Sequence, residues 1–279
     1  MIHGRKGKRC GQGAAATLAL LVMLSSACTD RGITGPTPTT GESHPGFDTS
    51  IYPGDAEMQA WLRPSSPYEW VGYYLQSPCH RDPSWMGKRQ TLTTMGWGLA
   101  VLYVGQQTFD GVPDVLFEED FQSSAVTCSR TLLTTEEGTT DAIDAVTKTA
   151  SEGFPNGTAI FLDIEHMDAI PASMEAYYRA WVQQVLADGR FRPGVYVHRD
   201  NAESIHSGIE RAYSDMNASG SAVYWVTSPT GFSLDASPSD VGFPWASVWQ
   251  GIYEVSQTWN GATINIDIDI ATTSSPSSP

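Results

Sequence analysis

Short apolar runs rich in β-branched and aromatic residues recur along the chain and alternate with stretches of helical periodicity. Apolar runs of this length, bounded by turn-forming residues, predict strands. The clearest helix is predicted over Ser173–Asp188, with Gly189 as its stop, and another over Thr139–Glu152. The predicted strands are Gly46–Tyr52, Trp70–Leu75, Leu99–Gly105, Thr158–Ile164, Gly194–His198, Ala222–Val226, Ser247–Gly251 and Ile264–Ala271.

Strands separated by helical segments predict parallel βαβ units and an α/β fold. Their number favours a single closed (β/α)8 barrel of the TIM type, somewhat compact, in which some connecting helices are short. The alternative is an open doubly wound sheet, which is disfavoured because no Gly-rich phosphate loop follows the first strand. With 279 residues, of which 41% are hydrophobic, the chain can bury the core of one large domain.

We place the predicted barrel at residues 46–271 and expect the segments on either side to lie outside it. Residues 1–27 combine a basic start, an apolar run too short to span a bilayer permanently and a small-residue end, which is typical of a secretory signal peptide. Residues 28–45, rich in Thr, Gly and Pro, predict a disordered linker, and residues 272–279 predict a polar tail that does not fold.

The run Leu24–Cys28 resembles a bacterial lipobox, in which the cysteine is lipidated after cleavage. We therefore expect an exported lipoprotein of the cell envelope that contacts the membrane only through a lipid anchor on Cys28. The alternative is ordinary cleavage after Ala27, which would give a secreted protein.

Acidic residues outnumber basic ones by 31 to 16, giving a formal charge of −15. Such a body repels a phosphate backbone, so we expect no nucleic-acid partner, whereas a neutral glycan is compatible with it. Cys79 and Cys128 predict a disulfide in an oxidising compartment, with two buried free thiols as the alternative. No Cys/His cluster has zinc-ligand spacing, so we expect no metal and no other cofactor. We also expect a monomer.

Carboxylates interrupt the apolar runs near the strand ends, where a barrel of this kind carries its active site. Asp48 lies in the first strand, Asp163 and Glu165 end the fourth, and Asp267 and Asp269 lie in the eighth. Since side chains alternate across a strand, Asp163 and Glu165 point to the same side. Two neighbouring acids push their pKa values apart, which is what acid-catalysed glycoside cleavage requires. The alternative is that Asp163 caps a helix while Glu165 is solvated.

A set of segments then carries a specific resemblance: GFDTS, WVGYYL, LAVLYVGQQ, AIFLDIE, RPGVYVHRDNA, YWVTSP, SVWQGI and IDIDI, in this order. Together they resemble the glycoside-hydrolase-like domain of unknown function 1906, which is similar to the lysozyme-type muramidases of glycoside hydrolase family 25. The resemblance implies a (β/α) barrel with Glu165 as proton donor. It also implies that Asp163 stabilises positive charge or orients an N-acetyl group, while Asp48 and Asp267 tune the pair. Strand parity alone does not separate Asp267 from Asp269.

Aromatic and amide side chains near the strand ends are candidates for sugar contacts, with core packing as the alternative for each aromatic. The predicted function is that of an exported glycoside hydrolase acting on a cell-envelope polysaccharide, with peptidoglycan as the first candidate. One alternative is a catalytically silent glycan-binding barrel, and a weaker one is a metal-dependent phosphodiesterase, which lacks His ligands on the first and fourth strands. The candidate sugar-contacting residues are Tyr74, Gln106, Tyr196, Trp225, Trp249 and Gln250.

Overall fold

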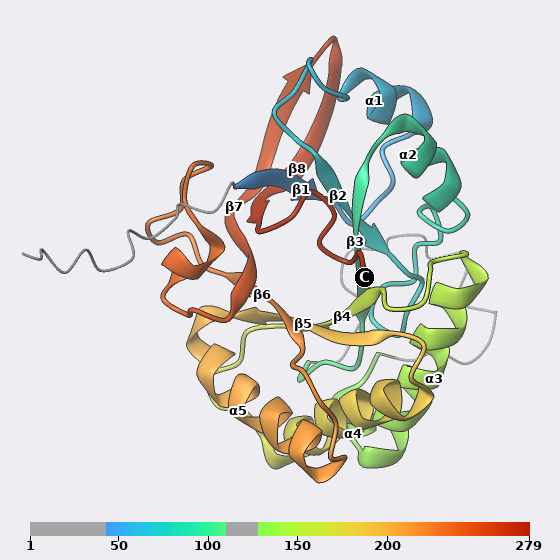
Figure 1. Cartoon of the computed structure of the whole chain (residues 1–279), viewed down its shortest axis with the longest axis vertical. Coiled ribbons are helices and arrows are strands. Elements are labelled where there is room, and N and C mark those ends of the chain that lie inside the picture. Colours follow the sequence, from blue (N-terminus) through green and yellow to red (C-terminus); the bar gives the residue numbers. More distant parts are fainter. Residues whose placement is uncertain (1–42, 110–127) are drawn as a thin grey trace, which may run out of the picture. The chain divides into compact units, whose positions relative to one another are not determined.

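The structure, a computed structural model, describes residues 43–109 and 128–279. The predicted signal peptide, Cys28 and most of the predicted linker lie outside these residues. From residue 43 on, the strands form a closed barrel in the order β1 to β8, with helices interleaved along the chain (Figure 1). The predicted fold class is therefore confirmed.

Every predicted strand is present, with shifted ends. The strands are β1 His44–Asp48, β2 Trp70–Tyr74, β3 Gly98–Val104, β4 Ala159–Ile164, β5 Arg192–His198, β6 Val223–Thr227, β7 Ala246–Trp259 and β8 Ala262–Ala271. The helices are α1 Asp55–Ala60, α2 Arg89–Met95, α3 Thr135–Ser151, α4 Ala172–Asp188 and α5 Arg199–Asp215, with the 3-10 turns η1 Arg130–Leu132 and η2 Pro238–Val241. The shortness of α1 and α2 agrees with the compact barrel expected from the sequence.

The first strand begins at His44, inside the segment predicted as linker. Its backbone pairs with β8, and the indole N–H of Trp70 donates to the His44 carbonyl at 2.9 Å. These partners hold a segment that its own composition would leave unfolded, because they satisfy its backbone hydrogen bonds.

The eighth strand differs from the expected parallel arrangement. β8 runs antiparallel to both β7 and β1. The cause is the turn Asn260-Gly261, whose φ values of 48° and 85° are both positive. Two residues with positive φ form the type I′ turn that joins antiparallel strands, and Asn-Gly is its preferred sequence. A hairpin therefore replaces the last crossover helix, and it projects from the barrel in Figure 1.

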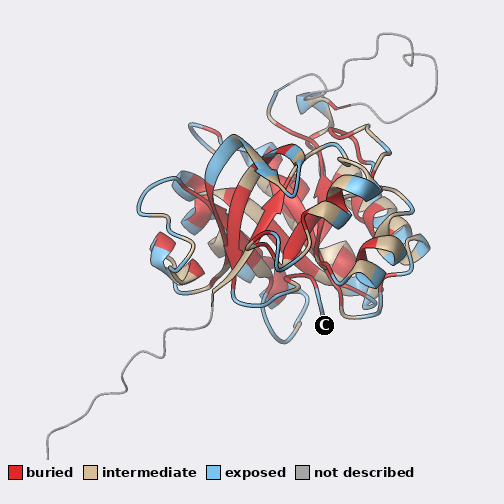
Figure 2. Cartoon of the chain, turned by 90° about the horizontal axis from the view of Figure 1, so that it is seen from above, coloured by how far each residue is buried: buried red, intermediate tan, exposed pale blue. Residues whose placement is uncertain are grey.

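The barrel interior is packed with side chains and not open. Its lower layers hold the rings of Trp70, Phe161 and Trp225, all fully buried. The ring of Trp70 lies over Gly46, its partner on the neighbouring strand β1, where a Cβ would lie 2.1 Å from the ring. The larger core lies outside the strands, where buried faces of the helices pack on the barrel (Figure 2).

Among the described residues, no helix combines the length and apolarity needed to cross a membrane.

The C-terminal segment 272–279 is polar, as predicted, but the expectation that it does not fold was wrong. Ser277 lies between the N-terminal ends of β3 and β4. Its N–H donates to the carbonyl of Leu99, and its own carbonyl accepts from the N–H of Ala159. Its hydroxyl accepts from the N–H of Val101 at 2.8 Å. The segment is held because it satisfies backbone groups that the strands leave unpaired, which needs no apolar surface.

We expect Ser277→Ala to destabilise the protein by about 1–3 kcal/mol, because it leaves the buried N–H of Val101 without an acceptor. Urea unfolding measures this change. Ser278→Ala is the matched control, since the Ser278 hydroxyl meets only Ser275 at the surface, and it should change the free energy of unfolding by less than about 0.5 kcal/mol. Equal effects of the two substitutions would contradict a structural role for the tail.

Candidate active site

The four acids singled out from the sequence line one cavity. It has a volume of about 360 Å³ and lies at the carboxyl ends of the parallel strands. Asp48, Asp163, Glu165 and Asp267 all contribute to its wall, together with Tyr74, Tyr196 and Gln250. Residues more than 200 positions apart in the chain thus converge, as a closed barrel requires of side chains at one rim.

Asp48 ends β1 and is held by two donors. The hydroxyl of Tyr74 donates to its Oδ1 at 2.6 Å, and the amide of Gln250 donates to its Oδ2 at 2.8 Å. The neighbouring strand must approach closely here, because a Cβ at Gly72 would lie 2.6 Å from the Cβ of Asp48. Both carboxylate oxygens of Asp48 are therefore fixed before any substrate binds.

Asp267 stands directly opposite Asp48 in the β1–β8 register. The Gln250 amide donates to its Oδ2 at 3.1 Å, and the backbone N–H of Glu254 donates to its Oδ1 at 2.6 Å. Glu254 lies where the β7–β8 register is irregular and has a φ of 50°, uncommon for a non-glycine residue. Bulges that re-aim backbone groups often lie next to functional sites, and this one directs an N–H at the carboxylate.

The register also separates Asp267 from Asp269, which strand parity could not do. Asp269 pairs with Gly46, one layer deeper than Asp48, and is fully buried. Its Oδ1 accepts from the indole N–H of Trp225 at 3.1 Å, and it does not line the cavity. Because β8 is antiparallel, the earlier of the two acids is the one nearer the rim.

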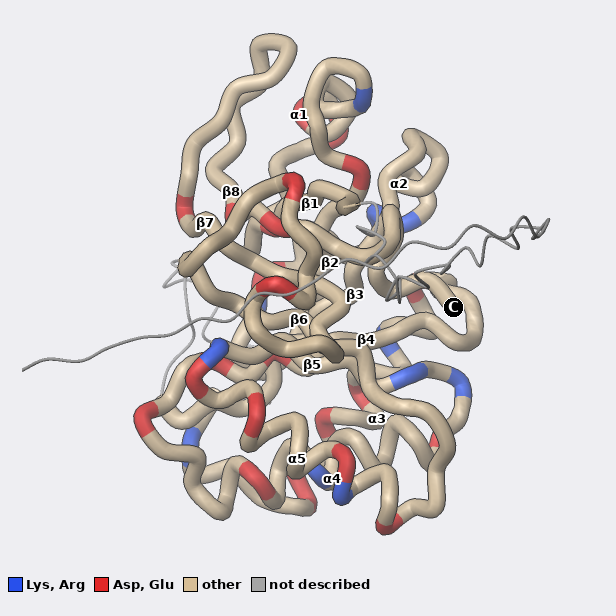
Figure 3. Tube along the Cα trace, turned by 60° about the vertical axis from the view of Figure 1, so that its left-hand side comes forward, with Lys and Arg blue, Asp and Glu red and all other residues tan. Residues whose placement is uncertain are grey.

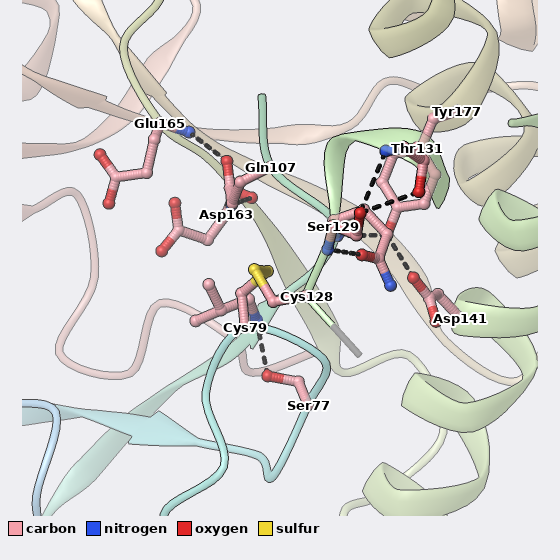
Figure 4. Close-up of a disulfide and its surroundings, with 12 residues drawn as sticks. Ser77, Cys79, Gln107, Cys128, Ser129, Thr131, Asp141, Asp163, Glu165 and Tyr177 are labelled. Carbon is pink, nitrogen blue, oxygen red and sulfur yellow. Dashed lines mark hydrogen bonds between the residues drawn. A yellow bond between two sulfur atoms is a disulfide. The ribbon is translucent and has the colours of Figure 1, made fainter. Parts of the chain in front are cut away.

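Asp163 and Glu165 point to the same side at the end of β4, as predicted (Figure 4). Asp163 is buried, whereas the side chain of Glu165 is exposed. Gln107, which the sequence analysis did not single out, braces both residues. Its amide donates to the carbonyl of Asp163 at 3.0 Å, and its Oε1 accepts from the N–H of Glu165 at 3.3 Å.

Burial governs the electrostatics of this cavity. Desolvation, with a further contribution from the charge of Asp267, raises the pKa of Asp48 to about 7. Desolvation, followed by the charges of Glu165 and Asp48, holds the pKa of Asp163 well above its usual range. Figure 3 shows acidic residues gathered where β1, β7 and β8 meet. Burial therefore favours the protonated forms of Asp48 and Asp163, so both carboxyl groups hold their protons to higher pH than a free aspartate does.

Three of the predicted sugar-contacting residues line the cavity, and three do not. Tyr74, Tyr196 and Gln250 form part of its wall, and the Tyr196 hydroxyl donates to Gln250 at 2.6 Å. Trp225 is buried in the barrel interior below the cavity. Trp249 is also buried but faces outward, against Phe232, because adjacent residues of a strand point to opposite sides and Gln250 points inward.

Gln106 also lies away from the cavity. Its backbone N–H donates to the hydroxyl of Tyr177 at 2.9 Å, and its side-chain oxygen accepts from the N–H of Ser129. Its role is to join the end of β3 to the segment before α3. The neighbouring Gln107 makes the contact with β4 instead. The alternation of side chains along a strand does not extend beyond its end, so it could not show which of the two glutamines faces β4.

Cys79 and Cys128 form a disulfide, as predicted, with Cα atoms 4.8 Å apart. Cys79 follows β2 and lines the cavity, while Cys128 precedes α3. Their side chains pack with Val104 and Tyr74 beside the carboxylates (Figure 4). The bond therefore fixes the residues before α3 to the rim next to Asp163.

Comparison with known families now identifies the domain. The model of the Rv2525c-like, glycoside hydrolase-like domain matches residues 59–271. The chain belongs to this family. The relationship inferred from the ordered segments GFDTS to IDIDI is thus confirmed, and this Rv2525c-like domain includes the strands that supply Asp163, Glu165 and Asp267. No curated protein matches the sequence.

Solved structures share the fold of this Rv2525c-like domain at low sequence identity. An uncharacterized protein from B. stearothermophilus has a TM-score of 0.52 at 18% identity, covering 82% of this chain and 95% of that one. The modular autolysin LytC from Streptococcus pneumoniae gives 0.52 at 13%, covering 82% of this chain and 46% of that one. The spore cortex lytic enzyme SleM from Clostridium perfringens gives 0.53 at 11%, covering 83% and 68%.

Asp48→Asn should flatten the pH dependence of stability. The pKa of Asp48 is about 7 in the folded protein and about 3.9 in an unfolded chain, so its contribution is fully present below about pH 4 and is lost as pH rises through about 7. The decline in unfolding free energy between pH 4 and 8 should be smaller in the variant by on the order of 4 kcal/mol. Urea unfolding across this range measures it.

A decline remains in the variant because Asp141, outside the cavity, also has a pKa raised to about 7 by burial. Asp235→Asn, at an exposed position, serves as the control and should follow the wild type. Parallel curves for Asp48→Asn and wild type would show that Asp48 ionises normally.

Proposed function

We propose that this Rv2525c-like domain is a glycoside hydrolase that cleaves a cell-envelope polysaccharide, with peptidoglycan as the first candidate substrate. The observation that carries the proposal is the pairing of buried Asp163 with exposed Glu165 at the end of one strand, in a cavity walled by two further fixed acids. A binding site for neutral sugar has no need of four adjacent carboxyl groups, since burying them costs free energy.

The two members of the pair are suited to different tasks. Glu165 is accessible from the cavity mouth and donates its proton to the glycosidic oxygen as the bond from that oxygen to the anomeric carbon breaks. Asp163 lies deeper, next to the developing positive charge, and its Oδ1 has no hydrogen-bond partner within the described protein atoms. That oxygen is available to stabilise the anomeric centre or a substrate N-acetyl group. Water then adds to the anomeric carbon, and its proton passes to a carboxylate of the cavity.

Asp48 and Asp267 act on this pair indirectly. Tyr74, Gln250 and the Glu254 N–H occupy their oxygens, so they are poorly placed to attack a sugar. Their effect is electrostatic, because charge on Asp48 raises the pKa of Asp163. We assign them to the tuning of the acid pair.

The fold comparison supports the choice of substrate. The autolysin LytC, which has this fold, is known in complex with a synthetic peptidoglycan ligand. SleM, with the same fold, is a lytic enzyme of the spore cortex. A peptidoglycan glycan strand is uncharged along its sugar backbone, so a cavity rich in acids does not repel it as it would a polyanion.

Glu165→Gln should lower turnover at least about 10²-fold, the lower end of what general acid catalysis contributes, while glycan binding stays nearly intact. The measurement is release of reducing ends from a panel of envelope polysaccharides, with binding followed by co-sedimentation. Glu210→Gln, at an exposed position on α5, is the matched control and should keep wild-type turnover.

Two outcomes would count against this assignment. Wild-type turnover in Glu165→Gln would remove Glu165 as the acid. Binding of a glycan by the wild type without any release of reducing ends would favour the silent glycan-binding barrel instead.

We further propose that the protein acts outside the cytoplasm, anchored by lipid on Cys28. The basic, apolar and small-residue order of residues 1–27 and the lipobox-like Leu24–Cys28 support this. The disulfide fits the same location, because disulfides persist in oxidising compartments.

Cys28→Ser should move the protein from the membrane fraction to the soluble exported fraction when it is expressed in a bacterium that processes lipoproteins, because a residue without a thiol cannot receive the lipid. Immunoblots of the two fractions measure this. Cys10→Ser, inside the predicted signal peptide, is the control and should stay with membranes. Unchanged membrane retention of Cys28→Ser would contradict the lipid anchor and leave export untouched.

A further inference from the structure

Two histidines and an aspartate meet at the rim beside the candidate active site. His166 follows β4, while His198 ends β5 and Asp200 opens α5. One potential ligand atom from each residue lies within 4.8 Å of the other two. The Oδ2 of Asp200 is 3.7 Å from Nε2 of His166 and 3.6 Å from Nδ1 of His198.

We infer that His166, His198 and Asp200 form a binding site for a divalent transition-metal ion of the zinc type. Imidazole nitrogens suit Zn²⁺, Cu²⁺ and Ni²⁺, whereas Mg²⁺ and Ca²⁺ prefer all-oxygen sites. Two His and one carboxylate are a recurrent ligand set for Zn²⁺, and they leave a fourth position for water. The inference is independent of the proposed hydrolase activity.

The two distances that involve Asp200 are close to those that an ion requires, while the His166 and His198 ligand atoms lie within 4.8 Å of each other. Zn–N and Zn–O bonds of about 2.0–2.2 Å place neighbouring ligand atoms of a tetrahedral site roughly 3.4 Å apart. The separations from Asp200 exceed this by a few tenths of an ångström. All three side chains are at least partly exposed, so an ion can reach them and small rotations can close the remaining gap.

The surroundings favour a cation over a simple ion pair. The ring centroids of His166 and His198 lie 4.6 Å apart, so a nitrogen of each ring and the Asp200 carboxylate are close enough to share one ion. A single ion satisfies both rings and the carboxylate. Arg199, between two of the ligands in sequence, extends toward Gly242. The chain as a whole carries a charge of −15, which attracts cations.

One contact competes with the ion and limits its affinity. His198 caps α5, where its Nδ1 accepts the backbone N–H of Asp200 at 3.2 Å. An ion bound at Nδ1 takes the same lone pair. We therefore expect a lower affinity for the ion than in a structural zinc site, where no hydrogen bond competes for the coordinating lone pairs. Such a site suits an ion that exchanges with solution.

Bound metal would link the end of β4 to the start of α5. Because His166 directly follows Glu165, the ion would restrain the backbone beside this cavity residue. From the sequence, no metal and no His ligand on the fourth strand were expected. His166 was not recognised as a ligand because it lies just beyond that strand, while His198 and Asp200 lie at and just after the end of the next one.

The test is calorimetric titration of Zn²⁺ into the chelator-treated full-length protein. We expect binding near one ion per chain and an affinity at least about tenfold lower in His166→Ala. Loss of a residue that only hydrogen-bonds to a ligand already costs about 10–100-fold, and loss of a ligand costs at least as much. Zn²⁺ should also raise the melting temperature of the wild type more than that of His166→Ala. Mg²⁺ should do neither.

Other histidines could bind zinc by themselves, so controls are needed. His206→Ala removes a ring that stacks on Trp245, outside this cluster, and should bind Zn²⁺ like the wild type. Asp200→Asn is the second test variant, since it keeps the size of the side chain and the N-cap of α5, and it should also weaken binding. Equal Zn²⁺ affinity in the wild type, His166→Ala and Asp200→Asn, or no wild-type binding at about 100 μM Zn²⁺, would overturn the inference.

Discussion

The antiparallel pairing of β8 with β1 is the constraint on which the rest of the site depends. It closes the barrel without a crossover helix between β7 and β8, and it sets Asp267 directly opposite Asp48. A parallel β8 would place Asp269 nearer the rim and Asp267 below it. The hairpin turn Asn260-Gly261 enforces the observed direction, because its two positive φ values match the twist of a two-stranded ribbon. A local turn thus decides which acid faces the cavity.

Convergence of acids in a packed barrel carries an electrostatic cost, and the network around Asp48 shows how the fold accommodates it. Tyr74 and Gln250 donate to Asp48, Gln250 and the Glu254 N–H donate to Asp267, and Trp225 donates to Asp269. These donors compensate only part of the desolvation, so the pKa of Asp48 stays near 7. Asp163 has fewer donors and a strongly raised pKa. Burial thus favours the protonated forms of Asp48 and Asp163, at the expense of stability toward alkaline pH.

The rim combines rigid and exchangeable elements. The disulfide joins the residues before α3 to those after β2, and Gln107 ties the end of β3 to the end of β4. Next to Glu165 in the chain, His166 belongs to the His166–His198–Asp200 cluster, which offers a third connection, between β4 and α5, whose strength would depend on a metal ion. The backbone at Glu165 is therefore held by the hydrogen bond from its N–H to Gln107, and a bound metal ion would hold it further at His166. Its own exposure leaves it accessible to a substrate at the mouth of the cavity.

The sequence by itself determined the strands, the barrel class, the cysteine pair and the acids that meet at one rim. These features follow from local signals: period-two apolar runs, glycine stops and carboxylates at strand ends. The strand parity of Asp163 and Glu165 is such a signal, and it held. The order of Asp267 and Asp269, the burial of Trp225 and Trp249, the bracing by Gln107 and the packing of Ser277 were decided only by the tertiary structure. Each of them depends on register between strands distant in sequence, which sets depth and facing. The metal-ligand cluster belongs with these, because His166 and Asp200 share a rim only after β4 and β5 pair side by side.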